Sequence, residues 1–159
     1  MDEREIRSIV QTVVEQLQPV PEIKLKCAMR LAEKVKAKAK EMGVNAVIAV
    51  SNRSANPILV ECMDDSYIAS YDIAVNKAFT VVSLKMPTSR LKELAQPGGS
   101  LYGIQFTHGG KIVIFGGGEV LTDGKGNIVG GLGVSGGTEE QDTALALYGK
   151  QIFENSGGN

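Results

Sequence analysis

The side chains that could do chemistry in this chain are few and lie far apart in the sequence. The single histidine, His108, occurs in Thr107-His-Gly-Gly110, and its imidazole could act as an acid or a base near neutral pH. The same four residues are typical of a solvent-facing hairpin turn, which is the interpretation we favour. Without a nucleophile in a recognisable context, one histidine does not form a Ser-His-Asp or Cys-His set.

Lys77 is a second candidate because it lies on a mostly apolar predicted helix. A lysine amine in that setting must either reach solvent or find an anion. Asp72, five residues earlier, is not on the same helix face and is a poor intrahelical partner. The remaining partners are a ligand carboxylate, a neighbouring subunit or solvent.

Glycine-rich turns give a third set of candidates. The turn Val134-Ser-Gly-Gly-Thr138 opens a predicted helix, whose N–H groups and positive dipole end could hold a carboxylate or phosphate. The alternative is a simple strand-to-helix turn with Thr138 as the N-cap. Neither this turn nor Gly116-Gly-Gly118 matches a P-loop or a dinucleotide fingerprint. The candidate binding positions are Gly117, Ser135, Gly136 and Gly137.

Composition limits the classes of function. The chain has 159 residues and a net charge of −1, which provides no global field for nucleic acid or anionic membranes. Cys27 and Cys62 are not in a CxxC pair, so neither a zinc site nor a disulfide scaffold is indicated. No apolar run is long enough to span a membrane, and the acidic start is unlike a secretory signal. We expect a soluble, cytoplasmic protein.

The predicted elements form an α+β domain with an antiparallel five-stranded sheet flanked by helices. Fifteen of the 19 glycines fall between Gly98 and Gly137, interleaved with β-branched runs, which predicts a three-stranded meander. A hairpin, 46–50 with 57–62, supplies the other two strands. Helices are predicted at about 23–42, 66–84, 88–94 and 139–153.

The first eighteen residues form a separate predicted unit. Their apolar residues recur at the spacing of an amphipathic helix, with acidic residues in the first turn. Pro19 and Pro21 break the helix. We therefore divide the chain into a helix (1–18), a proline linker (19–22), a domain (23–155) and a disordered tail (156–159). The apolar stripe consists of Ile6, Ile9, Val10, Val13, Val14 and Leu17.

From about residue 23 onward the chain resembles the GlcG/HbpS family, also found as the C-terminal domain of the PduO-type corrinoid adenosyltransferase. The matching stretches are AVIAV, MDDSYIASYDIAVNKAFTVVSLKMPT, QPGGSLYGIQ and GGKIVIFGGGEVLTDGKGNIVGGLGVSGGTEEQD. The chain departs from the family pattern in two turns. Asn52–Asn56 stands where relatives carry Asp and Gly, and Cys62-Met-Asp-Asp65 stands where they carry Arg-Met-Asp-Gly.

The resemblance implies a profilin-like fold, a homo-oligomer, and binding of haem or another tetrapyrrole without a settled enzymatic activity. The adenosyltransferase chemistry belongs to a separate helical domain and is not implied. If haem binds, its iron ligand could be His108, Cys27 or Met29, since imidazole, thiolate and thioether all ligate haem iron. Lys77 could then meet a haem propionate. Some relatives are thought to use a histidine on the helix at 23–42, where this chain has none.

The N-terminal helix and its proline linker are similar to the encapsulation peptides of bacterial microcompartment cargo. That likeness implies that the apolar stripe docks in a groove of a shell protein. Our first hypothesis is therefore a non-catalytic, cofactor-binding accessory protein inside a microcompartment of the propanediol, ethanolamine or glycyl-radical type. The alternatives are an enzyme acting on a small carboxylic or aldehyde metabolite through Lys77, and a structural protein that self-assembles through its first helix.

Overall fold

The sheet that positions the candidate residues has four antiparallel strands in the order β2-β1-β4-β3. A computed structural model describes residues 1–17, 19 and 21–157, so parts of the predicted linker and tail lie outside the described residues. The strands are β1 (Val47–Asn52), β2 (Pro57–Cys62), β3 (Gly118–Thr122) and β4 (Ile128–Ser135). The predicted α+β class with an antiparallel sheet is confirmed, but the expectation of five strands is wrong.

The missing strand is the run Lys111–Phe115, whose β-branched and aromatic residues between glycine turns had placed it in the meander. Thr80 explains the difference, because its Oγ1 accepts a hydrogen bond from the Val113 N–H at 3.0 Å. A backbone N–H of this run therefore donates its hydrogen bond to a helix side chain. In a strand, the same N–H would donate to a neighbouring strand. Ile112 and Val113 are buried, so the run is apolar because it packs beneath other elements.

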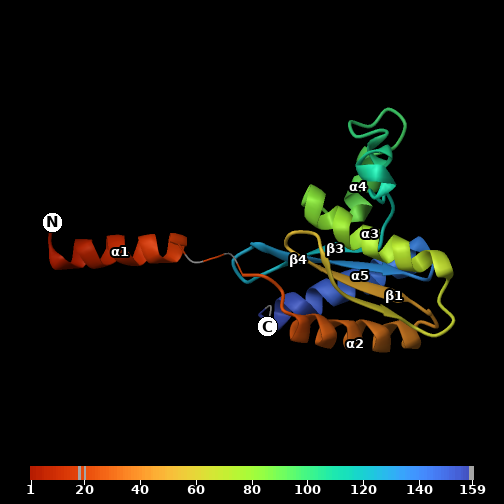
Figure 1. The fold of residues 1–159 in the computed structure, drawn as a ribbon, viewed down its shortest axis with the longest axis horizontal. Helices are drawn as coiled ribbons and strands as arrows, with labels where there is room; N and C mark the ends of the chain where they lie inside the picture. The colour runs from red at the N-terminus through yellow and green to blue at the C-terminus, as the bar shows by residue number, and fades with distance from the viewer. Residues whose placement is uncertain (18, 20, 158–159) are drawn as a thin grey trace.

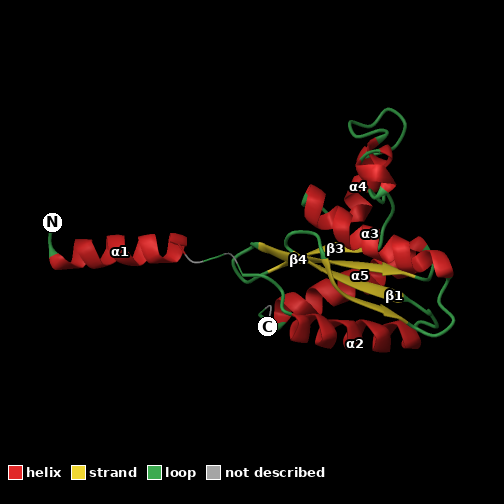
Figure 2. Ribbon diagram, in the orientation of Figure 1, coloured by secondary structure: helices red, strands yellow, loops and turns green. Residues whose placement is uncertain are grey.

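Helices cover both faces of the sheet (Figures 1 and 2). On one face lies α3 (Ile68–Leu84), and on the other lie α2 (Leu25–Glu41) and α5 (Glu139–Asn155). The glycines of β4 allow α3 to approach closely, since a Cβ at Gly133 would collide with the Ala74 carbonyl oxygen. The larger core cluster lies between the sheet and the α2–α5 layer, and includes Val35, Leu132 and Leu145.

A projecting arm, defined here as residues 96–111, follows the short helix α4 (Thr88–Leu94) and stands away from the sheet in Figure 1. It contains two 3₁₀ turns, Ile104–Phe106 and His108–Gly110. The predicted hairpin turn at 107–110 is therefore wrong, because no strands flank it among the described residues.

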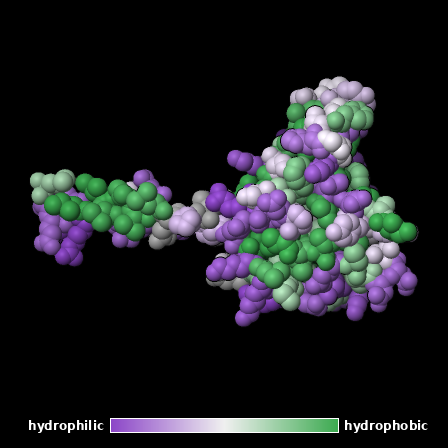
Figure 3. Space-filling model, viewed as in Figure 1, coloured by the Kyte–Doolittle hydropathy of each residue, from purple (hydrophilic) through white to green (hydrophobic). Residues whose placement is uncertain are grey.

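The first helix, α1 (Glu3–Leu17), extends away from the rest of the chain (Figure 1). None of its residues, all of which are described, is buried. Its apolar side chains form the green band along the helix in Figure 3, and the exposed fractions in the stripe range from 44% for Val13 to 77% for Leu17. No helix in the described part of the chain is long and apolar enough to cross a bilayer.

Candidate functional site

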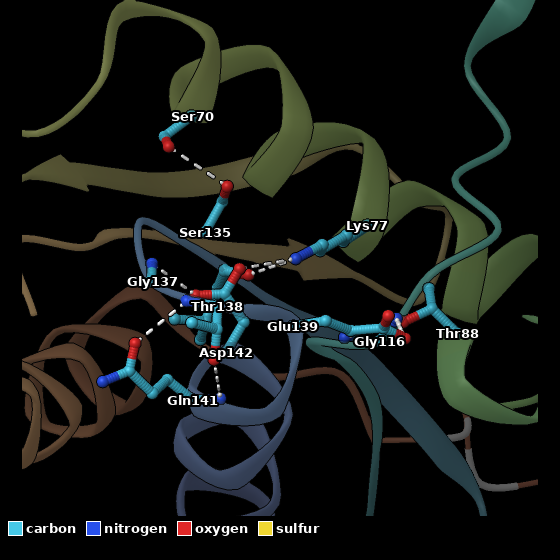
Figure 4. A network of polar contacts seen from close by, with 12 residues as sticks. Ser70, Lys77, Thr88, Gly116, Ser135, Gly137, Thr138, Glu139, Gln141 and Asp142 are labelled. Atoms are coloured by element: carbon cyan, nitrogen blue, oxygen red, sulfur yellow. Dashed lines mark hydrogen bonds and ion pairs between the residues drawn. The ribbon is translucent and has the colours of Figure 1, made fainter.

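Lys77 is fully buried, and its partners belong to the same chain (Figure 4). Its Nζ donates to the Val134 carbonyl oxygen at 2.8 Å and to Asp142 Oδ2 at 3.0 Å. Burial lowers the pKa of Lys77, and the Asp142 carboxylate opposes that shift. The expectation that Lys77 would meet a ligand, another subunit or solvent is thus corrected, because an internal ion pair joins α3 to α5.

Asp142 reaches Lys77 because of the way α5 begins. Thr138 caps the helix in a capping box, where Thr138 Oγ1 accepts from the Gln141 N–H and Gln141 Oε1 accepts from the Thr138 N–H. The Gly137 N–H donates to Asp142 Oδ1 at 2.9 Å. The helix N-terminus that we considered for a ligand anion therefore already holds the carboxylate of Asp142. The interpretation of Thr138 as an N-cap is confirmed.

A cavity of about 250 Å³ lies beside this ion pair, and we call it the serine cavity. Two buried hydroxyls line it, with Ser135 Oγ donating to Ser70 Oγ at 3.1 Å. Tyr67 and Phe115 add aromatic walls, and the Phe115 ring centroid is 5.0 Å from Lys77 Nζ. Of the sequence candidates, the structure gathers here Lys77, Gly117, Ser135, Gly136 and Gly137.

A second ion pair lies at the edge of the serine cavity. Glu139 Oε1 accepts from the Gly116 N–H at 2.9 Å, and its Oε2 is 2.7 Å from Lys92 Nζ. The hydrogen bond from Lys92, followed by that from Gly116, lowers the pKa of Glu139. Both carboxylates of the cavity are therefore matched by a lysine of this chain, and the site presents no unbalanced charge to a ligand.

Cys27 lies at a different place, in the first turn of α2 and 8% exposed. It lines a cavity of about 480 Å³, which we call the Cys27 cavity, and a smaller one of about 110 Å³ against Ile152 and Phe153. Ile23 and Val129 give the larger cavity an apolar wall. Its charged lining residues are Glu22, Lys24, Lys26, Arg30 and Asp123. A volume of this size is typical of a small-molecule site.

The other two candidate iron ligands lie apart from both cavities. The Met29 side chain is 49% exposed on α2. His108 is exposed on the projecting arm, where its ring packs edge-on against Phe79 with the centroids 5.9 Å apart. Neither residue lines a cavity described above.

Sequence reasoning missed Asp142, Ser70 and Phe115 as residues of the serine cavity. Asp142 follows the GVSGG motif that carries the family resemblance, and that position was its only signal. Lys77 and Asp142 are 65 residues apart, so helical spacing could not pair them. The sequence around Ser70 and around Phe115 contains no pattern of polar residues that would indicate a site.

Comparisons with known proteins agree with this architecture. The model of the family described as haem degrading protein HbpS-like matches residues 23–151. An uncharacterized 15.0 kDa protein in the dhaT-dhaS intergenic region of Citrobacter freundii is 45% identical over 137 residues, which are 86% of this chain and 95% of that protein. The corrinoid adenosyltransferase PduO of the same organism is 38% identical over 69% of this chain, but the match spans only 32% of PduO.

A solved structure of a PduOC:haem complex has a TM-score of 0.78 and 32% sequence identity, covering 82% of this chain and 94% of that one. That structure is a complex of PduOC with haem. Together with the family model and the two curated relatives, the match establishes that this chain belongs to the HbpS-like family.

Proposed function

We propose that this protein binds haem or a related tetrapyrrole in the Cys27 cavity as an accessory protein. The observation that carries the proposal is that, of the three candidate iron ligands, Cys27 is the one that lines a cavity of about 480 Å³. The haem complex of PduOC supports the choice of ligand class.

The residues of the cavity fit the chemistry of the group. Cysteine thiolate is a known axial ligand of haem iron. The apolar wall of Ile23 and Val129 suits the face of a macrocycle, and Lys24, Lys26 and Arg30 suit its propionate carboxylates. None of these three cations forms a hydrogen bond or an ion pair with another residue that the structure describes. Bound haem would supply a redox-active iron, while the chain supplies the ligand and the charge balance.

Haemin titration tests this assignment. The wild-type protein should shift the Soret band, and Cys27→Ala should abolish or move that shift. Met29→Ala and His108→Ala are matched controls, because each removes a candidate ligand outside the cavity and should titrate like wild type. A Soret shift that survives Cys27→Ala and disappears with either control would refute the assignment.

We also propose that α1 targets the protein to a microcompartment by binding a shell protein. Support comes from the exposed apolar stripe of α1, none of which is buried and which is available for helix-in-groove docking, and from the resemblance of this segment to encapsulation peptides. Residues 1–20 fused to a fluorescent protein should co-localise with shells. The same fusion carrying Ile9→Asp and Val13→Asp keeps the charge pattern of the polar face and should be diffuse. A diffuse wild-type fusion would remove the targeting proposal.

The third part of the proposal is a homo-oligomer formed by the domain. Large apolar side chains stand exposed on the domain itself, including Ile68 at 98% and Phe106 at 81%. Sedimentation of residues 21–159 should give a mass above that of one chain. Loss of the oligomer on removal of residues 1–20 would instead favour self-assembly through α1.

A further inference from the structure

Two separate surfaces of exposed aromatic and apolar side chains on the domain lack a partner among the residues that the structure describes. The first, which we call the α3 patch, consists of Tyr67, Ile68 and Tyr71, with exposed fractions of 73%, 98% and 50%. The second is the arm tip, Tyr102 and Phe106, exposed at 64% and 81%. Aromatic side chains gathered in this way on a surface are typical of protein interfaces.

The arm is held at its root and free at its tip. On its return leg, His108 packs against Phe79, and Lys111 Nζ lies 5.7 Å from the Phe79 ring centroid. Phe79 is eight residues beyond Tyr71 on α3, which is about 12 Å along the helix at 1.5 Å per residue. A chain whose arm is anchored at that point leaves its own α3 patch uncovered, as the exposed fractions confirm.

Charge distinguishes the possible occupants of the α3 patch. Three exposed carboxylates flank it, those of Asp64, Asp65 and Asp72. The arm contains no acidic residue and ends at the exposed Lys111. The apolar stripe of α1 is a poorer match, because α1 and the residue before it carry four carboxylates and two arginines. In Figure 1, α1 also leaves from the end of the sheet at the β3–β4 turn, away from the start of α3.

We propose that the arm tip of one copy of this chain docks on the α3 patch of a second copy. The inference rests on the homo-oligomer proposed above and names its contact. Phe106 and Tyr102 pack on Tyr67, Ile68 and Tyr71 of the second copy, and the arm brings no carboxylate against the acidic rim. Because Tyr67 also lines the serine cavity, the second copy completes the wall of that cavity.

Disulfide trapping between two variants that each carry one introduced cysteine, in addition to the buried Cys27, tests the contact. In a Cys62→Ser background, Phe106→Cys and Ile68→Cys chains are mixed and oxidised. The mixture should give a linked dimer that neither variant gives alone. Leu147→Cys, on a comparably apolar and 42% exposed position of α5, replaces Ile68→Cys in the matched control and should give none.

Sedimentation separates the two ways in which the inference can fail. An oligomeric protein without the Phe106–Ile68 link refutes this contact and leaves the homo-oligomer standing. A monomeric protein refutes both. If the contact is correct, the double variant Tyr102→Ser, Phe106→Ser loses the oligomer, while its Soret shift with haemin stays as in the parent chain.

Discussion

The lysines at the serine cavity and the lysines at the Cys27 cavity differ in whether they form ion pairs within the chain. At the serine cavity, Lys77 and Lys92 are each bound to a carboxylate of the same chain. At the Cys27 cavity, Lys24 and Lys26 form no ion pair with the described residues. A ligand anion can bind Lys24 and Lys26 without breaking an existing ion pair. Binding to Lys77 would instead leave the Asp142 carboxylate buried without its lysine. Under our proposal, the serine cavity contributes to stability and the Cys27 cavity binds the ligand.

The largest expected effect comes from breaking the internal ion pair. Asp142→Ala leaves the Lys77 ammonium buried without its carboxylate, so we expect the free energy of unfolding to fall by about 3–5 kcal/mol. Urea denaturation measures the loss. Arg30→Ala at the Cys27 cavity is the matched control and should change stability by no more than about 0.5 kcal/mol. Equal losses of unfolding free energy for the two variants would contradict the proposed difference between the cavities.

The next largest effect compares a glycine that packs against α3 with a glycine in an open turn. Gly133→Ala places a methyl group against the Ala74 carbonyl oxygen on α3. We expect a loss of about 1–3 kcal/mol, which is typical of overpacking in a core. Gly124→Ala serves as the control, since a Cβ there has no atom within 4 Å. The prediction fails if thermal unfolding ranks the two variants together.

Removing the cap of α5 should have a smaller effect. Thr138→Ala deletes the hydroxyl that accepts from the Gln141 N–H, so the unfolding free energy should fall by about 1 kcal/mol. Thr138→Ser keeps the hydroxyl and should behave like wild type. Haem binding at the Cys27 cavity should be the same in both variants, and a haemin titration that changes with Thr138→Ala would contradict the separation of the two sites.

The smallest effect concerns Glu119, a buried carboxyl on β3 that, unlike Asp142, has no ion-pair partner among the described residues. Burial raises the pKa of Glu119 above its ordinary value of 4.5, against the opposing charge of Lys150. The folded state therefore binds more protons than the unfolded state just above pH 4.5, and stability falls as pH rises through that window.

Glu119→Gln removes this cost. The variant should be slightly more stable than wild type at pH 7, and the difference should shrink as pH falls toward 4.5. Glu139→Gln should show the opposite sign, because Lys92 lowers the pKa of Glu139 and its contribution to stability is lost as pH falls through that lowered pKa. Urea midpoints measured from pH 7 to 4.5 test the first variant, and midpoints measured below pH 4.5 test the second. An unchanged gap for Glu119→Gln at every pH would contradict the first.

Local patterns in the sequence predicted much of the fold. The periodicity of residues 3–17, the hairpin around Asn52–Asn56 and the start of α5 at Thr138 each depend on neighbours in the chain, and all are present. Belonging to the HbpS-like family was also indicated by the glycine-rich segment and the GVSGG motif.

The errors all involve contacts between distant segments. Residues 111–115 have the composition of a strand, but the Thr80 hydroxyl takes one of their backbone donors. Lys77 had no visible partner because Asp142 lies on another helix. Cys27, Met29 and His108 were equivalent as candidate ligands until the cavities distinguished them. Composition shows which groups are present, but only packing shows which of them face a cavity.

The outer edge of β2 has a consequence for how copies of this chain assemble. β2 begins at Pro57, which has no backbone donor, and Glu61 near its end is 2.6 Å from Lys36 of α2. A proline and a tethered charge along an edge strand discourage a second molecule from adding its own strand. Addition of a neighbouring molecule's strand to the sheet is thereby discouraged at this edge.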